Sequence, residues 1–283
     1  MSIKIIIDSA SDISPAEAKQ LGVEMIPLQI TFCGNDYYDG VDLTPQKFYE
    51  MLVETDDLPK TSQISPFRFA TIFDKALKEY DEVLVITLSS KLSNTYNSAV
   101  LASQEFEGKV FVVDSLNATL GERLVCLRAL EMAKAGMCAK DIKDVLDQEK
   151  HEINVIAVVD TLEYLQKGGR ISKATAIVGE IFSFKPVIAV IDGEVKSLGK
   201  ARGSKRANNL LCELVAEKGI DFTRPYGTIY SGLSDIFLDK YIKDSAHLWE
   251  KDTTSVPKYI LGCTIGTHVG PGAVGVAFFS KKK

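Results

Sequence analysis

Hydroxyl side chains are concentrated in two short segments of the first half of the chain. One is the segment 61–65, TSQIS, and the other runs from Ser89 to Thr95. Each precedes a predicted helix, so about one hydroxyl per helix is expected to cap free backbone N–H groups. The other hydroxyls exceed what capping requires. Hydroxyls and free N–H groups at a helix start form a good anion site, so these segments indicate capture of a carboxylate without a buried cation.

A carboxylate held in this way would need an apolar tail for tight binding. Hydrogen bonds to a charged group contribute about 1.5–3 kcal/mol each, which orients a headgroup. Each buried CH2 group adds about 0.8 kcal/mol. The combination suits a fatty acid, although the sequence does not show a tunnel for its tail. Ile64, Phe182, Phe184 and Ile188 could line one, with packing in the core as the default interpretation of each.

A histidine near the end of the chain offers a second kind of chemistry. His268 stands in the segment THVGPG, which we expect to be a loop between strands at 257–266 and 273–280. With Ser93 or Ser62 as nucleophile and His268 as base, the chain could be a serine hydrolase or acyltransferase. No third orienting acid is apparent and the GxSxG motif is missing, so this alternative has less support.

Other cofactor chemistry is not indicated. GPGAVG (270–275) matches GxGxxG, but a strand rather than a helix should follow it, and the chain has no GxxxxGK[ST] motif. The three histidines have no metal-ligand neighbours at suitable spacing. The segment 8–12, DSASD, places Ala10 where aspartyl phosphatases have their second carboxylate, so we interpret it as turn chemistry. We therefore expect no metal and no cofactor.

Composition restricts the class of protein. The chain has 283 residues, of which 46% are apolar and 25% charged, which suggests two globular domains. A net charge of -5 disfavours general nucleic-acid binding. Five cysteines without CxxC spacing favour a reducing compartment, and no apolar run reaches the roughly 18 residues of a membrane span. We expect a cytoplasmic protein.

Strands and helices alternate in the first half of the chain. We expect strands at 3–8, 23–31, 82–88 and 109–115, with helices that begin at Ser14-Pro15, Thr44-Pro45 and Ser65-Pro66. This alternation predicts a parallel α/β sheet, whose ligands bind beyond the carboxyl ends of the strands. Both hydroxyl segments should lie at that edge.

The second half has a different pattern. We expect a strand at 154–160, a hairpin at 186–198 with Asp192-Gly193 at its turn, and further strands before and after a helix from Ser234. This indicates an α+β domain with a mixed or antiparallel sheet. We place the domains at 1–154 and 155–283.

Seven segments in this order resemble the DegV family over nearly the whole chain. They are IIIDSASDI (5–13), TSQIS (61–65), SSKLSNTYNSA (89–99), VVDS (112–115), DTLEYLQKGGRIS (160–172), KPVI (185–188) and IGTHVGPGAVGVAFF (265–279). The resemblance implies a two-domain α/β fold with a lipid tunnel between the domains. It also implies a fatty-acid-binding subunit of bacterial fatty acid kinase, whose separate catalytic subunit uses ATP to phosphorylate the bound carboxylate to an acyl phosphate for phospholipid synthesis.

The resemblance also implies roles for individual residues. Thr61, Ser62 and Ser93 should contact the carboxylate, the loop at Asn94 should close around it, and His268 should reach it from the second domain. Many members of the family have Gly at the position of Asn94, whose side chain could narrow this loop.

Two arginines are implied at the tunnel mouth. Arg170 and Arg202 should position the acyl phosphate or dock the kinase, although the first could be a structural clamp and the second an exposed helix start. The partners implied are a long-chain fatty acid, the kinase catalytic subunit and, transiently, a membrane surface, without nucleic acid and without catalysis by the chain alone. A lipid buffer or transcriptional partner without kinase coupling is a third reading.

Overall fold

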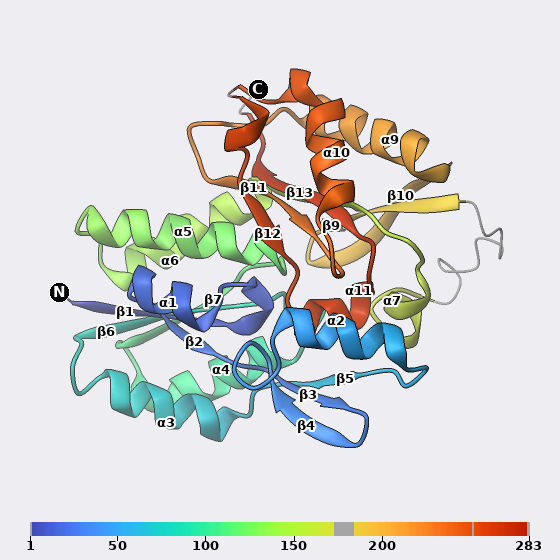
Figure 1. Ribbon diagram of the computed structural model, residues 1–283. Helices are drawn as coiled ribbons and strands as arrows, with labels where there is room; N and C mark the ends of the chain where they lie inside the picture. Colours follow the sequence, from blue (N-terminus) through green and yellow to red (C-terminus); the bar gives the residue numbers. More distant parts are fainter. Residues whose placement is uncertain (1, 173–183, 251, 282–283) are drawn as a thin grey trace.

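Two large β-sheets form the framework of the chain (Figure 1). The computed structural model describes residues 2–172, 184–250 and 252–281. The first sheet has the strand order β2-β1-β6-β7, and every neighbouring pair is parallel, as the strand–helix alternation predicted. Its strands are β1 (Ile3–Asp8), β2 (Glu24–Ile26), β6 (Glu82–Thr87) and β7 (Val110–Asp114).

The second sheet is mixed, which confirms the prediction for this half of the chain. Its order is β10-β9-β8-β13-β11-β12, with β11 and β12 parallel and the other pairs antiparallel. The strands are β8 (Ile153–Val158), β9 (Phe184–Ile191), β10 (Glu194–Arg202), β11 (Tyr226–Tyr230), β12 (Lys258–Ile260) and β13 (Val274–Phe279). Asp192 and Gly193 form the hairpin turn, both with positive φ. The boundary that we placed at residue 155 falls inside β8.

A small antiparallel sheet was not foreseen from the sequence. It has the order β4-β3-β5 and comprises β3 (Gln29–Phe32), β4 (Asn35–Tyr38) and β5 (Lys60–Ser62). The single strand expected at 23–31 was therefore wrong. Pro27 has no N–H group and separates β2 from β3, which turns away from the parallel sheet and joins this second pairing.

Three helices begin where local capping signals predicted. Ser14, Thr44 and Ser65 each accept a hydrogen bond from the backbone N–H three residues later, and a proline follows each. These helices are α1 (Pro15–Leu21), α2 (Pro45–Glu54) and α3 (Pro66–Ala76). The other helices among the described residues are α4 (Thr95–Ser103), α5 (Leu120–Lys134), α6 (Ala139–Glu149), α7 (Glu163–Lys167), α9 (Gly203–Lys218), α10 (Ile236–Asp244) and α11 (Cys263–Val269). None of the described helices is long and apolar enough to cross a membrane.

Short 3-10 helices complete the connections. They are η1 (Ser9–Ser11), η2 (Gln104–Phe106), η3 (Lys150–Glu152), η4 (Ala246–Leu248) and η5 (Thr253–Ser255). The helix expected from Ser234 to about residue 250 is therefore shorter, since α10 ends at Asp244 and η4 follows.

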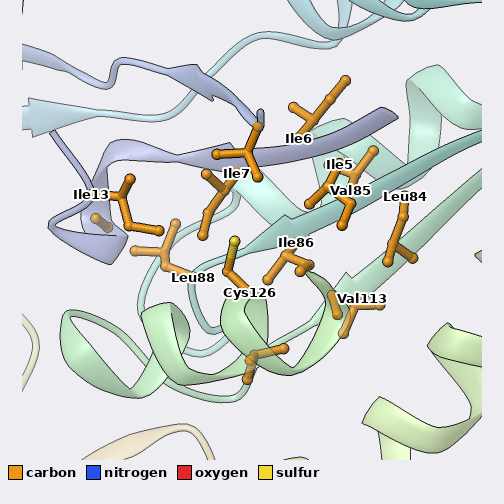
Figure 2. Packing of buried hydrophobic residues seen from close by; sticks show 14 of the residues in the cluster. Ile5, Ile6, Ile7, Ile13, Leu84, Val85, Ile86, Leu88, Val113 and Cys126 are labelled. Atoms are coloured by element: carbon orange, nitrogen blue, oxygen red, sulfur yellow. The ribbon is translucent and has the colours of Figure 1, made fainter. Parts of the chain in front are cut away.

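Helix α5 lies between the two large sheets and packs against both. Its first seven residues are all buried, which is the pattern of a helix covered on every side. A Cβ on Gly121 would come within 2.6 Å of Val155 of β8, so glycine allows this close approach. Figure 2 shows one part of the resulting core, where Ile7, Ile86 and Leu88 lie around Cys126 of α5.

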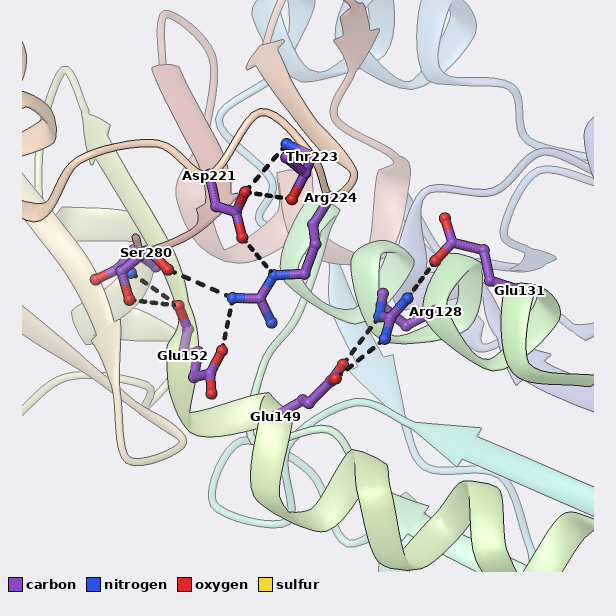
Figure 3. Close-up of polar contacts among 9 residues, drawn as sticks. Arg128, Glu131, Glu149, Glu152, Asp221, Thr223, Arg224 and Ser280 are labelled. Atoms are coloured by element: carbon purple, nitrogen blue, oxygen red, sulfur yellow. Dashed lines mark hydrogen bonds and ion pairs between the residues drawn. The ribbon is translucent and has the colours of Figure 1, made fainter. Parts of the chain in front are cut away.

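The end of the chain is fastened to the start of β8 by Arg224 (Figure 3). Its guanidinium pairs with Glu152 at 2.6 Å and with Asp221 at 3.0 Å, and it lies 4.1 Å from the ring centre of Phe279. The N–H of Ser280 donates to the carbonyl of Glu152 at 2.9 Å. This partly buried network holds β13 beside β8.

We predict that Arg224→Met lowers the free energy of unfolding by about 2 kcal/mol, because it removes the guanidinium that pairs with the partly buried carboxylates of Glu152 and Asp221. Methionine keeps an apolar stem over Phe279. The matched control is Lys240→Met, which removes an exposed ion pair with Asp244 and should cost less than about 0.5 kcal/mol. Urea unfolding of both variants measures the difference, and equal effects would contradict a structural role for the Arg224 network.

Candidate ligand-binding site

Helix α11 begins against two buried carboxylates from the first half of the chain. Asp39 accepts hydrogen bonds from the N–H groups of Cys263 and Thr264 at 3.2 and 3.1 Å. Asp12 accepts one from the N–H of Gly262 at 2.9 Å. These bonds satisfy N–H groups that a helix start leaves free. The expectation of a strand through residue 266 and a loop around His268 was therefore wrong, since β12 ends at Ile260 and His268 lies on α11.

His268 is held against the first hydroxyl segment. Its Nε2 atom lies 2.9 Å from Oγ1 of Thr61, and its Nδ1 atom is buried without a hydrogen-bond partner among the described residues. A Cβ on Gly168 would come within 2.3 Å of Nδ1, so glycine is needed there for the ring to fit. Burial, followed by the nearby charge of Arg170, lowers the pKa of His268 from 6.5 to about 3. The imidazole is therefore neutral near neutral pH.

The two hydroxyl segments meet through Thr95 at the start of α4. Its Oγ1 atom accepts a hydrogen bond from the N–H of Ile64 at 3.4 Å and lies 2.9 Å from Oγ of Ser93. Nε2 of Gln63 donates to Oγ of Ser98 at 3.2 Å. Segments that are about 30 residues apart in sequence thus lie together: the second directly follows β6 of the first sheet, and the first begins on β5 of the small antiparallel sheet.

Arg170 brings a positive charge close to this group. Its Nε donates to the carbonyl of Leu92 at 3.1 Å and its Nη1 to the carbonyl of Gly168 at 2.5 Å. Gly169 has a φ of 73°, which favours glycine in this turn. The side chain is half-buried, and burial lowers its pKa from the usual value. Arg170 therefore clamps the second hydroxyl segment and also faces the cavity.

A single cavity joins these polar side chains to an apolar interior between the two sheets. Thr61, Ser62, Ser93, Arg170 and His268 all line it. Sixteen of its 25 described lining residues are Ala, Val, Leu or Ile. They come from both sheets and from the segments between them, and include Leu28, Leu88, Val155, Ile188, Val190 and Ile229. The cavity is therefore polar at one end and apolar over most of its wall.

Two predicted site residues lie outside this lining. Asn94 is exposed at the start of α4, and its Oδ1 accepts a hydrogen bond from Asn97 at 2.7 Å. Arg202 is exposed at the junction of β10 and α9. Of the four tunnel candidates, Ile188 lines the cavity, Ile64 packs in the core, Phe184 is half-buried on β9, and Phe182 lies outside the described residues.

Polar residues that sequence reasoning missed also line the cavity. They are Gln63, Thr119 and Thr264. Gln63 stood inside a segment already selected for its hydroxyls, so that signal was available. No sequence signal indicated Thr264, because the pattern around it is typical of a strand. Asp12 and Asp39 were missed for a related reason, since their partners on α11 are more than 220 residues away.

Ser93 and His268 are not arranged as a nucleophile and its general base. Nε2 of His268 faces Thr61, and the hydroxyl of Ser93 is bonded to Thr95. A base must lie within hydrogen-bond reach of its nucleophile. Across the described ranges, no group of three or more His, Cys, Asp or Glu side chains could hold a metal ion.

Known families and proteins match this chain over nearly its whole length. Residues 2–281 match the sequence model of a family described as uncharacterised proteins of the DegV family. A DegV domain-containing protein of Caldanaerobacter subterraneus is 38% identical over 282 residues, which is 99% of each chain.

Solved structures with the same fold come from several bacteria. A DegV family protein of Thermus thermophilus, described as binding fatty acid, is 33% identical with a TM-score of 0.86, and the match covers 99% of this chain and 100% of that one. DegV of Bacillus subtilis, described as a fatty acid binding protein, is 30% identical with a TM-score of 0.84, over 99% and 100% of the two chains.

We predict that His268 stays neutral in the folded protein well below the ordinary histidine range. Because its folded pKa of about 3 lies below its unfolded value of 6.5, its contribution to stability is full above about pH 6.5 and is lost as the pH falls. Wild type should lose up to about 1.4 kcal/mol per pH unit relative to His268→Gln between about pH 6 and pH 4. Unfolding at several pH values measures this. A His268 ring signal in NMR that titrates near 6.5 would contradict it.

Proposed function

The chain belongs to the DegV family, and we propose that it binds one long-chain fatty acid in the cavity between its sheets. The carboxylate would lie at Thr61, Ser62, Ser93 and His268, and the tail along the apolar wall. The observation that carries this proposal is a single cavity with its polar side chains at one end and an aliphatic wall. The fatty-acid binding described for relatives at 33% and 30% identity supports it.

The headgroup site suits a carboxylate that is held largely by neutral donors. The hydroxyls of Thr61 and Ser93 can each donate a hydrogen bond to an oxygen of the ligand, and the neutral ring of His268 can orient the hydroxyl of Thr61 by donating to it from Nε2. The half-buried guanidinium of Arg170 donates hydrogen bonds to two backbone carbonyls, and its positive charge would attract the carboxylate. Each bond to the charged oxygen would contribute about 1.5–3 kcal/mol.

The apolar wall suits the alkyl tail of the ligand. Aliphatic residues offer no hydrogen bonds, so an alkyl chain loses none on leaving water, and each buried CH2 would contribute about 0.8 kcal/mol. A polar ligand would be desolvated there without compensation. The tail therefore supplies most of the affinity, while the headgroup supplies the orientation.

We further propose that the chain presents the carboxylate to the catalytic subunit of a fatty acid kinase, which would transfer the γ-phosphoryl group of ATP to a carboxylate oxygen and release ADP. Ser62 and Gln63 are exposed and also line the cavity, so the polar end borders the surface. Arg170 would position the acyl phosphate, and the exposed Arg202 would dock the kinase. This coupling is proposed from the family resemblance. The same resemblance is the basis for proposing a cytoplasmic location and transient contact with a membrane surface.

We predict that native mass spectrometry of the purified protein finds the added mass of one fatty acid. Ser93→Ala should weaken binding of oleate or palmitate by about 10- to 100-fold, because it removes one hydrogen bond to the carboxylate. Thr61→Val should act in the same direction.

The matched control is Ser103→Ala, the same substitution at the other end of α4, where the hydroxyl bonds to the carbonyl of Val100 outside the cavity. It should leave affinity unchanged. A protein that carries no lipid and binds neither acid would overturn the proposed function.

We predict that Arg202→Glu abolishes acyl phosphate formation by a bacterial fatty acid kinase with ATP while fatty-acid affinity stays as in wild type. Affinity should be unchanged because Arg202 is exposed and lies outside the cavity lining. Phosphorylation should be lost because the reversed charge would prevent docking of the kinase. Lys78→Glu, an equal change of charge on another exposed side chain, is the control. If Arg202→Glu supports normal phosphorylation, Arg202 does not dock the kinase. If wild type supports none, the chain acts as a carrier without kinase coupling.

A further inference from the structure

A second cavity lies directly behind the fatty-acid cavity. It is lined by residues of β8, β9, α9 and the segment after β7, and three of its lining residues, Val155, Ala189 and Val190, also line the first cavity. These three residues of β8 and β9 therefore belong to a wall that both spaces share.

The wall stands where two strands separate. Val155 of β8 and Val190 of β9 are register partners and form the last pair between these strands at this end. Beyond them, Ile153, Asn154, Ile191 and Asp192 line the second cavity. Val155 is buried and Val190 is half-buried. The two valine side chains thus form part of the wall between the two cavities, at the end of a β-ladder.

The wall is held in place from the hairpin turn. Oγ of Ser89, in the loop after β6, donates a hydrogen bond of 2.7 Å to the carbonyl of Gly193. Gly193 has a φ of 82°, and a Cβ there would come within 2.5 Å of that hydroxyl. The turn between β9 and β10 is therefore fixed against the first sheet, and Val190 cannot readily move away to lengthen the cavity.

We propose that the Val155–Val190 pair is the chain-length stop of the fatty-acid cavity. The terminal methyl group of the longest accepted acid lies against these two side chains, and a longer chain must displace them to enter the second cavity. That second space contains Leu116, Leu198 and Leu214 beside charged side chains such as Lys150 and Glu217, so it can accept a few further carbon atoms once the wall is opened. The inference rests on the proposed binding of fatty acids.

The test compares affinity across saturated acids from laurate through myristate, palmitate, stearate and arachidate to behenate. For wild type, affinity should rise by about fourfold per added CH2 up to a limit and then fall. Val155→Ala removes two methyl groups from the wall and should move this limit to the next longer acid in the series. Val190→Ala should do the same, which keeps the test valid if one variant does not fold.

Val187→Ala is the matched control. Val187 is on β9 but buried in the core on the α9 side of the sheet, away from both cavity linings. It should leave the limit unchanged. The inference is overturned if both wall variants keep the wild-type limit, or if Val187→Ala shifts it equally. Failure of wild type to bind any acid of the series would instead overturn the proposed function.

Discussion

The structure of the site depends on the burial of two carboxylates at the start of α11. Asp12 and Asp39 lie in the first half of the chain, yet they accept the N–H groups that open a helix near its end. Burial raises the pKa of Asp12 to about 7, against the bonds from Thr119 and Gly262, which lower it. A buried N–H group without an acceptor would destabilise the fold by about 1–3 kcal/mol. A helix start at another position, away from these carboxylates, is therefore unfavourable. The position of His268 opposite Thr61 follows from this contact.

The second constraint is the core that α5 shares between the sheets. Its apolar residues pack with β1 and β6 on one side and with β8, β11 and β13 on the other. The cavity borders the start of α5, where Ala118 and Thr119 line it, and most of its remaining wall is aliphatic. Arg123 of α5 donates to the carbonyl of Asp12 and pairs with Glu17. At the start of α1, the hydroxyl of Ser14 accepts the N–H of Glu17, while the carboxylate of Glu17 pairs with Arg123.

Local signals predicted the parts of the fold that local physics controls. Ser14, Thr44 and Ser65 cap their helices because a cap needs only residues three positions apart. The second hydroxyl segment directly follows β6 of the parallel sheet, whereas Thr61 and Ser62 of the first lie on β5 of the small antiparallel sheet, which the sequence did not predict. Helix α11 was not predictable, since the alternation in its sequence is typical of a strand and its acceptors are 224 and 250 residues away. For the same reason, the sequence identified His268 as a candidate but not the helix that carries it.

The shared core also has a consequence for the kinetics of ligand exchange. Because α5 is packed on both sheets, rotation of one sheet away from the other would expose its apolar side chains to water. Such a hinge motion would therefore be unfavourable, and a ligand bound as proposed would leave through a local opening at the polar end, where Ser62 and Gln63 reach the surface. Residence time is then governed by the free energy of that opening, while affinity is governed by the buried tail. A partner that loosened this opening would speed release of the proposed ligand without changing the affinity of the free protein for it.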